Sequence, residues 1–464
     1  MERILIKETG KRSGEKVKLA GWVQSIRSHG KILFFDLRDV SGTAQIVFTP
    51  KDNEELYNQA KEVRPEWVVE IEGEVKERPE GMQNKEIETG NVEIKAVSLN
   101  VFSRAKTLPF PIDTEGYEIN EKSRLEQKYI DLRRPRIKRN LETRHRTIKF
   151  MRDFLSREGF LEIETPVLTK STPEGARDFV VPSRNYSEKF YALPQSPQQY
   201  KQLLMVAGLE KYFQVARCFR DEDPRGDRQP EFTQLDIEVA FWEQKDILNL
   251  VEKLYTDLIK ELFPDKKIME SPFPVLTYKE AMEEYETDRP DIRKDKSNAN
   301  ELAFCFVIDF PMFEYKEGDK RWGAMHNPFT RPQTEDIEEI KNDKENILAY
   351  QYDLVLNGHE IAGGALRSYK PEILEAVFES LGYEKEEIKK QFGHLLQAFE
   401  YGVPPHGGVA FGLDRFLAVV LNEPSIREVI AFPKTGDNKD LMMDSPSDIT
   451  KEQLRELHLK IEKK

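Results

Sequence analysis

The sequence predicts an α+β protein that opens with an all-β N-terminal domain. Residues 1–104 consist of short stretches rich in Val, Ile and Phe, several of them separated by Gly and Ser turns, which is typical of strands. Beyond about residue 140 the pattern changes to long amphipathic helices that alternate with strands. The chain has 464 residues, so we expect two or three domains of about 150 residues each.

The N-terminal stretches follow the order of an OB-fold barrel. Strands are expected at 16–27, 31–39, 43–49, 66–78 and 92–103, with one helix at 53–63. Five strands with a helix after the third are typical of the OB fold, which commonly binds single-stranded nucleic acid. A generic small β domain is the alternative.

The rest of the chain reads as a linker followed by a large mixed domain. Residues 105–140 are expected to be a linker or hinge, because prolines stiffen this stretch before it becomes basic. For the domain at 141–464, helices are predicted at 144–160, 196–209, 246–263 and 449–464, and strands at 160–168, 210–222 and 229–242. Pro166 favours an edge position for the first of these strands.

Composition narrows the class of protein. Two cysteines, Cys218 and Cys305, cannot form a disulfide framework, so we expect a reducing, cytoplasmic location. The N-terminus carries charges throughout, unlike a signal peptide, and no apolar run approaches the roughly 18 residues that span a membrane. The net charge of −13 argues against nonspecific coating of DNA. A local basic or aromatic surface would still be enough to bind a nucleic acid.

The segment 217–238 predicts a hairpin with one unusually polar face. On its second strand, Thr233, Leu235, Ile237 and Val239 point one way, and Phe232, Gln234, Asp236 and Glu238 point the other way. A polar, acidic face inside a large domain is costly unless it meets a ligand. Arg220 shares a face with Glu222 on the first strand, and its forked guanidinium suits a phosphate or carboxylate. A solvated hairpin with surface salt bridges is the alternative.

A second hairpin carries two carboxylates. Asn357-Gly358 is a strong two-residue turn signal, which pairs Val355 with Glu360 and makes Asp353 a diagonal neighbour of Glu360. Two carboxylates on one face repel each other unless a cation lies between them. Mg²⁺ suits such a pair, because it favours few carboxylates together with substrate phosphates. A solvent-exposed acidic pair is the alternative.

A third segment, residues 407–416, is a glycine-rich strand that runs into a helix. Asp414 is expected to cap this helix. Arg415 would lie at the positive end of the helix dipole, so a ligand explains it better than helix stability does. Neither a P-loop nor a GxGxxG fingerprint occurs in the chain, so a nucleotide would need another architecture.

Together these segments resemble the class II aminoacyl-tRNA synthetases, and nearly the whole chain resembles the bacterial-type aspartyl-tRNA synthetases. GFLEIETPVLT is similar to motif 1, FRDE with RQPEF to motif 2, and GLDR to motif 3. LTKSTPEGARDF, YALPQSPQQYKQLL, AMHNPFT and VIAFPKT are phrases specific to this family. The resemblance implies an OB-fold anticodon-binding domain joined to an antiparallel sheet flanked by helices, and a homodimer formed through motif 1.

The resemblance also implies a nucleotide site. Its ATP-binding residues would be Arg220, Asp221, Glu222, Gln229, Phe232, Glu360, Gly412, Leu413, Asp414 and Arg415. Among them, Arg220 would clamp the α-phosphate and the aspartate carboxylate, and Phe232 and Arg415 would sandwich the adenine. Asp353 and Glu360 would hold Mg²⁺. Arg220, Arg415 and Glu360 would be the catalytic residues.

The amino-acid site implied by the resemblance is suited to L-aspartate. Its residues would be Glu174, Gln198, Gln199, Tyr200, Lys201, Arg220, His326 and Arg367. Glu174 would meet the substrate ammonium. Lys201 and Arg367 make chemical sense because a side-chain carboxylate needs cations, and this need separates aspartate from asparagine. An enzyme of the same class that activates asparagine or lysine, and a non-catalytic tRNA-binding paralogue, are the alternatives.

In the barrel, the resemblance assigns anticodon contacts to Arg27, Phe34 and Gln45. Core packing is the alternative for Phe34, but the adjacent Phe35 points to the other face, so only one of the two need be core. His29 and Gly81 resemble the relaxed type that charges both tRNA(Asp) and tRNA(Asn). A strictly discriminating aspartate–tRNA(Asp) ligase is the alternative.

One feature departs from the family pattern. Bacterial-type members usually carry an inserted domain between motifs 2 and 3, and here residues 285–302 form only a short polar stretch. None of the expected site residues lies in the insert, so we expect aminoacylation to survive its loss.

Overall fold

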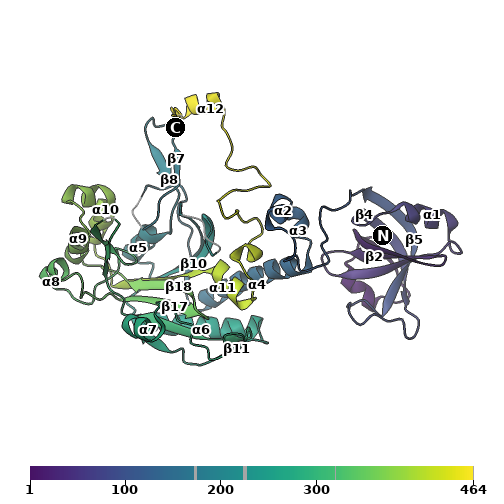
Figure 1. Cartoon of the computed structure of the whole chain (residues 1–464), viewed down its shortest axis with the longest axis horizontal. Helices are drawn as coiled ribbons and strands as arrows, with labels where there is room; N and C mark the ends of the chain where they lie inside the picture. The colour runs from purple at the N-terminus through teal and green to yellow at the C-terminus, as the bar shows by residue number, and fades with distance from the viewer. Residues whose placement is uncertain (172–174, 223–226, 319, 463–464) are drawn as a thin grey trace. The chain divides into compact units, whose positions relative to one another are not determined.

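The computed structural model describes residues 1–171, 175–222, 227–318 and 320–462. The chain divides into two compact units, Met1–Pro111 and Ile112–Lys464 (Figure 1). Over these described ranges, none of the helices is long and apolar enough to cross a lipid bilayer.

The first unit is a closed five-stranded barrel. Its elements are η1 (Ile6–Lys11), β1 (Lys16–His29), β2 (Ile32–Arg38), β3 (Thr43–Phe48), α1 (Glu54–Glu62), β4 (Val68–Glu77) and β5 (Val92–Ser103). The strands run around the barrel in the order β1-β2-β3-β5-β4, and β4 pairs back to β1. With α1 between β3 and β4, this arrangement confirms the predicted OB fold.

Alternation along β2 separates the inside of the barrel from its surface. Leu33, Phe35 and Leu37 are buried in the barrel core, and Phe34 lies on the outer face and is half-buried. Successive side chains of a strand point to opposite faces, so one phenylalanine of the pair fills the core and the other remains available. The expectation that only one of them need be core is confirmed.

The second unit is built on an eight-stranded sheet in the order β12-β14-β17-β18-β19-β10-β9-β6. These strands are β6 (Leu161–Glu162), β9 (Lys211–Phe219), β10 (Glu231–Ala240), β12 (Val275–Thr277), β14 (Phe304–Ile308), β17 (Gln351–Leu356), β18 (His359–Leu366) and β19 (His406–Gly412). The six strands from β14 to β9 are antiparallel, and the two outermost strands add in parallel. The predicted antiparallel sheet therefore forms the centre of a mixed one.

Helices and smaller two-stranded sheets surround this sheet. The helices are α2 (Glu121–Glu126), α3 (Lys128–Asp131), α4 (Pro135–Arg157), α5 (Gln198–Val206), α6 (Gln244–Leu262), α7 (Tyr278–Tyr285), α8 (Ile337–Asn342), α9 (Pro371–Ser380), α10 (Lys385–Phe399), α11 (Leu413–Val420), η2 (Ile426–Val429) and α12 (Lys451–Glu456). The small strands are β7 (Val180–Pro182), β8 (Phe190–Ala192), β11 (Lys267–Ile268), β13 (Glu301–Leu302), β15 (Phe313–Lys316) and β16 (Arg321–Ala324).

The main core lies on one face of the large sheet. The apolar sides of α4, α6 and α11 pack there against Leu235, Ile237, Val409 and Phe411 of the central strands. Burial of these side chains removes apolar surface from water and fixes the sheet on its helices. The polar positions of the same strands consequently face the opposite side, where α5 lies.

The segment 105–140 differs from the expected linker. The second unit begins at Ile112, and this segment contains α2, α3 and the start of α4. Arg124, Asp131 and Arg134 are buried in it. A run of charges resembles a solvated linker in sequence, but here the charges are paired with one another and with distant residues. The strand expected at 160–168 is also shorter, and the tail helix expected at 449–464 is limited to α12.

Residues 285–302 are a compact connection between α7 and β14. Arg293 binds both carboxylate oxygens of Asp291, at 3.0 and 2.8 Å. Asn357, at the turn of the β17–β18 hairpin, accepts a bond from the Ala303 amide at 2.8 Å and donates one to the Glu301 carbonyl at 3.0 Å. The segment that replaces the inserted domain thus packs against the turn of the acidic hairpin.

Candidate active site

A cavity of about 340 Å³ lies on the sheet face opposite the main core. Its walls come from motif 2 and β10, from the acidic β17–β18 hairpin, and from the end of β19 with the start of α11. The three segments singled out in the sequence are therefore brought together around one space. The polar face predicted for β10 contributes Phe232, Gln234 and Asp236 to the wall.

Four buried charges meet at the floor of the cavity: Lys201, Asp236 and Arg367 line it, and Glu238 pairs with Lys201 and Arg367. Lys201 on α5 lies 2.7 Å from Asp236 and 3.2 Å from Glu238. Arg367 holds Glu238 through two bonds, from Nε to Oε1 at 2.9 Å and from Nη2 to Oε2 at 3.2 Å. Burial alone would raise the pKa of Glu238, but Arg367 and Lys201 lower it to about 2. Burial also raises the pKa of Asp236, while Lys201 opposes this effect.

Two acceptors at this floor are positioned for a ligand. The Oδ2 atom of Asp236 is buried and has no hydrogen-bond partner among the described residues. Gln198 donates to Gln202 Oε1 at 3.1 Å, and Gln202 lies 3.2 Å from Nε2 of His406, whose Nδ1 is 2.8 Å from the Pro404 carbonyl. This relay orients Gln198 so that its own amide oxygen can accept a bond. An ammonium group would satisfy both acceptors.

Motif 2 supplies a cation and an aromatic ring. The Arg220 guanidinium lies over the Phe232 ring, 5.1 Å from its centroid, and Arg220 Nε is 3.4 Å from the Gln195 carbonyl. Arg220 makes no ion pair with any residue in the described ranges, so its charge is available to an anion. Glu222 and Gln229 also line the cavity, and Gln229 Oε1 accepts a bond from the Lys434 amide at 2.7 Å.

Motif 3 places a second arginine at the opposite wall. Gly412 is the N-cap of α11, and Arg415 in the first turn donates to the Glu360 carbonyl and lies 3.6 Å from Asp227. The expectation that Asp414 caps the helix is wrong: this residue lies inside the first turn and pairs with Arg144. Leu413 is buried in the main core, so only its backbone could meet a nucleotide.

Two carboxylates converge on the acidic hairpin. The predicted pairing of Val355 with Glu360 is confirmed, and a bulge between Leu354 and Val355 places Asp353 opposite Gly363. A Cβ atom at Gly363 would lie 3.0 Å from Asp353 Oδ1 and 3.6 Å from Glu360 Oε1. Both carboxylates therefore lie close to the Cα of Gly363, which has no side chain, and this arrangement fits a cation bound between them. Burial and the nearby Asp353 raise the pKa of Glu360.

The donor set suits magnesium better than a softer metal. Within the described ranges, no three His, Cys, Asp or Glu side chains gather as a metal site. Two carboxylates with room for phosphate oxygens are the arrangement that Mg²⁺ favours. His326 lies 3.6 Å from Asp353 and also lines the cavity.

Some expected site residues lie elsewhere. Gln199 and Tyr200 line a second cavity beside the first, because α5 turns Gln198 and Lys201 toward the floor and its two intervening side chains away from it. The Asp221 side chain is not part of the cavity wall. Glu174 falls outside the described residues.

Three residues that support the site were not anticipated, and of these Gln351 lines the cavity. Gln202 and His406 form the relay behind Gln198, and Gln351 donates to Asp353 at 2.9 Å. Gln202 lies four residues after Gln198, so the helical period alone could have placed the two side chains on one face. His406 and Gln351 come from distant strands, and only the sheet order brings them close.

On the barrel, the expected anticodon residues share one outer face. Arg27 pairs with Phe34 across β1 and β2, and Arg27 lies 2.7 Å from Asp36 and 3.5 Å from Gln45. His29 is exposed at the end of β1, and Gly81 is exposed with a φ of 81°. Both positions thus lie at the surface of the barrel rather than in its core, His29 at a strand end and Gly81 in a turn.

The second unit has a sheet with an antiparallel centre, and its cavity is built from an arginine-bearing hairpin and a glycine-rich strand-to-helix turn. Together with the OB barrel, these features define a class II aminoacyl-tRNA synthetase. Residues 120–436 match the family described as tRNA synthetases class II (D, K and N), and residues 17–101 match the OB-fold nucleic acid binding domain. The chain belongs to this family of class II tRNA synthetases.

Individual relatives agree with this assignment. The chain is 40% identical to the Aspartate--tRNA(Asp/Asn) ligase of Rubrobacter xylanophilus, over 97% of this chain and 95% of the relative. It is 41% identical to the enzyme of the same name from Hydrogenobaculum sp., over 97% of each chain. Among solved structures, asparaginyl-tRNA synthetase from Pyrococcus horikoshii, complexed with asparaginyl-adenylate, has a TM-score of 0.75 at 24% identity, covering 94% and 98% of the two chains.

The alignments also bear on the missing insert. The match to the Rubrobacter enzyme extends over 571 positions, which exceeds the 464 residues of this chain. The relatives therefore carry segments that this chain lacks, in agreement with the short connection at 285–302.

Proposed function

We propose that the protein is an aspartate–tRNA ligase that activates L-aspartate with ATP and transfers it to tRNA. The floor of the cavity carries this proposal. Lys201 and Arg367 both contact Glu238 and both line the cavity, so they bring two buried cations to its floor, which suits a side-chain carboxylate. The unpartnered oxygen of Asp236, with Gln198, suits the substrate ammonium. Asparagine, with a neutral amide, would leave these cations less well satisfied.

The upper part of the cavity suits ATP. Phe232 and Arg415 would hold the adenine ring between them by stacking and cation–π contact, and Arg220 would bind the α-phosphate together with the aspartate carboxylate. The carboxylate oxygen then attacks the α-phosphorus, the bond to pyrophosphate breaks, and aspartyl-adenylate forms. The protein contributes positioning and charge stabilisation rather than a covalent nucleophile.

Asp353 and Glu360 would hold Mg²⁺, which would neutralise phosphate charge when it is bound. In the second step, a hydroxyl of the terminal tRNA ribose attacks the adenylate carbonyl and releases AMP. Arg220 would remain in place to stabilise the phosphate charge of the leaving group.

The choice of tRNA is proposed to be relaxed, with both tRNA(Asp) and tRNA(Asn) as substrates. Arg27, Phe34 and Gln45 form one outer barrel face that would contact anticodon bases. His29 and Gly81 are of the residue types that resemble the relaxed members of the family, and relatives at about 40% identity are named Aspartate--tRNA(Asp/Asn) ligase; both support the relaxed choice. A His29→Leu variant is expected to charge tRNA(Asn) less well than tRNA(Asp). Loss of charging of both to the same extent would contradict this role of His29.

We also propose that the protein forms a homodimer and acts in the cytoplasm. The motif 1 strand β6 is the outermost strand of the large sheet, and its neighbourhood exposes Leu161, Val167 and Leu168, each 46–54% accessible. An exposed apolar edge of this kind favours association with a second copy. Analytical ultracentrifugation tests this directly, with a monomeric mass as the contradicting result.

Amino-acid-dependent exchange between ATP and pyrophosphate tests the proposed activation. We expect exchange with aspartate and little with asparagine or lysine. A Lys201→Met variant is expected to lose aspartate-dependent exchange. Exchange with asparagine but not aspartate would favour the asparagine-activating alternative. Binding of tRNA without any exchange would favour a non-catalytic paralogue.

A further inference from the structure

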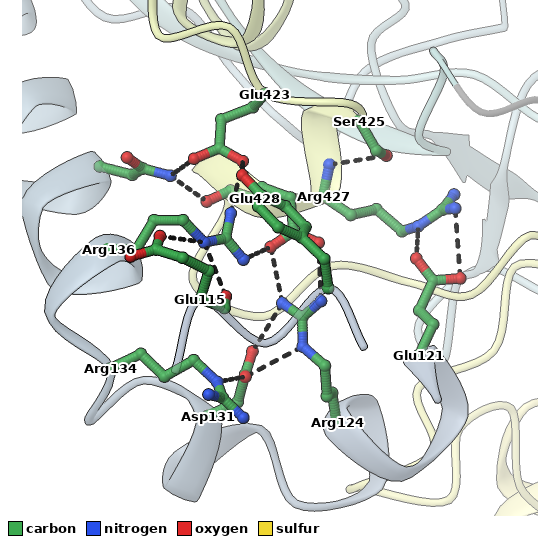
Figure 2. A network of polar contacts seen from close by, with 12 residues as sticks. Glu115, Glu121, Arg124, Asp131, Arg134, Arg136, Glu423, Ser425, Arg427 and Glu428 are labelled. Atoms are coloured by element: carbon green, nitrogen blue, oxygen red, sulfur yellow. Dashed lines mark hydrogen bonds and ion pairs between the residues drawn. The ribbon is translucent and has the colours of Figure 1, made fainter. Parts of the chain in front are cut away.

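A cluster of buried charges joins the start of the second unit to the turn that follows motif 3. This hinge cluster consists of Arg124, Asp131, Arg134, Arg136, Glu423 and Glu428 (Figure 2). Sequence alone suggested a linker for the part that contains the arginines. The residues on the other side of the cluster lie about 300 positions later, as the separation of 304 between Arg124 and Glu428 shows.

Glu428 is the point where the two sides of the hinge cluster meet. Arg124 on α2 donates to it with Nη1 at 3.1 Å and Nη2 at 2.6 Å, and Arg136 on α4 adds a bond at 2.8 Å. Arg136 also pairs with Glu423, and Asn140 donates to Glu423 at 2.6 Å and to the Glu428 carbonyl at 3.2 Å. Three residues, Arg124, Arg136 and Asn140, thus donate hydrogen bonds to two acidic side chains and one carbonyl in the segment after α11.

The other side of the hinge cluster holds the first residues of the unit. Arg134 donates to the Thr114 carbonyl at 2.8 Å, and Arg136 donates to the Glu115 carbonyl at 2.9 Å. Asp131 binds Arg124 at 3.0 Å and Arg134 at 2.8 Å. Arg136 therefore holds both the chain that enters the unit and the turn after motif 3, and Arg134 is joined to that turn through Asp131 and Arg124.

These contacts bear on the ATP site through α11. This helix carries Arg415 in its first turn and ends close to Glu423. Arg144 on α4 pairs with Asp414 at its beginning, and the hinge cluster holds the residues after its end. Ile426, in the turn between Glu423 and Glu428, lines the cavity itself. The helix is thus anchored at both ends by cations of α4 and α2.

We propose that Arg124, Arg136 and Glu428 are positioning residues for ATP binding, which set the place of α11 and thereby of Arg415. The proposal rests on the proposed function, in which Arg415 contacts the adenine. Loss of one member of a buried charge cluster leaves its partners unsatisfied, so the surrounding segments must shift. A shift of about 1 Å at a positioned group can lower activity by up to a hundredfold.

A matched pair of variants tests this inference. Glu428→Gln keeps the side-chain shape and removes the charge that the two arginines share. Glu121→Gln removes the charge from a neighbouring ion pair, in which Arg427 Nε lies 2.7 Å from Glu121 Oε1. Arg427 belongs to the same turn as Glu428, but the Glu121 side chain is partly exposed. Figure 2 shows both pairs side by side. Steady-state exchange kinetics give the KM for ATP and for aspartate, and thermal unfolding gives the Tm.

We expect Glu428→Gln to raise the KM for ATP about tenfold and to leave the KM for aspartate unchanged, because the aspartate floor lies on other elements. Glu121→Gln should change neither value. A lower Tm with an unchanged KM for ATP would overturn the proposal, since a merely structural role predicts that result.

Two additional measurements keep the test decisive. Arg136→Lys retains the charge but loses the forked geometry, so it should fold even if Glu428→Gln does not, with a smaller rise in the KM for ATP. ATP binding measured by calorimetry does not depend on which amino acid is activated. Weakened ATP binding by the variants would support the positioning role even if aspartate-dependent exchange were absent, whereas unchanged binding would contradict it.

Discussion

Arg367 and Glu238 form a buried, two-bonded ion pair at the base of the cavity, with Nε–Oε1 and Nη2–Oε2 distances of 2.9 and 3.2 Å. Their side chains are 5% and 0% exposed, so water cannot replace either partner. The pair comes from β10 and from the residue directly after β18, two strands separated in the sheet only by β19. The geometry of the amino-acid site thus depends on the register of the central strands.

A Glu238→Gln substitution is expected to weaken both folding and aspartate binding. Removal of one partner of a buried pair costs about 3–5 kcal/mol of folding free energy, because the other charge is left uncompensated. Arg367 would also lose its fixed orientation, so the KM for aspartate should rise more than the KM for ATP. Urea unfolding and exchange kinetics measure the two effects. Equal rises in both KM values would contradict a role specific to the aspartate site.

His406 gives a testable pH dependence of stability. Burial lowers its pKa below the ordinary value, with Glu238 opposing this effect. The unfolded chain therefore binds a proton at a higher pH than the folded chain does, and stability falls as the pH drops below about 6.5.

A His406→Gln variant isolates this contribution. The difference in Tm between the wild-type protein and the variant should change between pH 7.5 and 5.5, with the wild type losing more stability on acidification. A constant difference over this range would show that His406 does not titrate differently in the two states.

Phe34 and Phe35 are adjacent residues with opposite expected roles. Phe35 is 0% exposed in the barrel core and contacts Phe48 at a ring distance of 4.7 Å, whereas Phe34 lies on the outer face. Phe35→Ala should destabilise the barrel by about 3–5 kcal/mol. Phe34→Ala should leave stability nearly unchanged and raise the KM for tRNA, because base stacking on an aromatic ring contributes about 1–3 kcal/mol.

Calorimetric unfolding and aminoacylation kinetics distinguish the two variants. Strong destabilisation by Phe34→Ala, with an unaltered KM for tRNA, would show that Phe34 acts in core packing and not in tRNA binding.

Asn357 is expected to stabilise the turn of the acidic hairpin. It has a φ of 50°, and its side chain binds the Ala303 amide and the Glu301 carbonyl. Asn357→Ala removes two hydrogen bonds and leaves a residue that adopts this φ less readily, so we expect a loss of about 2 kcal/mol. Asn346→Ala is the control, since its side chain binds only Asp343 at an exposed site. Equal stability of the two variants would exclude this role.

Local periodicity predicted the parts of the structure that depend on neighbouring residues. The Asn357-Gly358 turn predicts the pairing of Val355 with Glu360, because a two-residue turn determines register, and the structure has this pairing. The polar face of β10 followed from simple alternation. The bulge beside Leu354, which moves Asp353 opposite Gly363, leaves no comparable signal in the sequence.

Long-range pairing was not predictable in the same way. The arginines at 124–136 have the composition of a basic linker, and their burial depends on Glu423 and Glu428 far along the chain. On α5, the family resemblance assigned four consecutive residues to aspartate. Helical spacing would have favoured Gln198 and Lys201, which do line the cavity, over the two residues between them.

The most direct test of the proposed activity is aminoacylation of tRNA(Asp) and tRNA(Asn) transcripts with labelled aspartate by the wild-type protein. The aspartate floor and the ATP wall predict that aspartate is the amino acid attached, and His29 and Gly81 in the barrel predict that both tRNAs accept it, well above an unrelated tRNA. Attachment of aspartate to neither tRNA, or attachment of asparagine in its place, would contradict the proposed function.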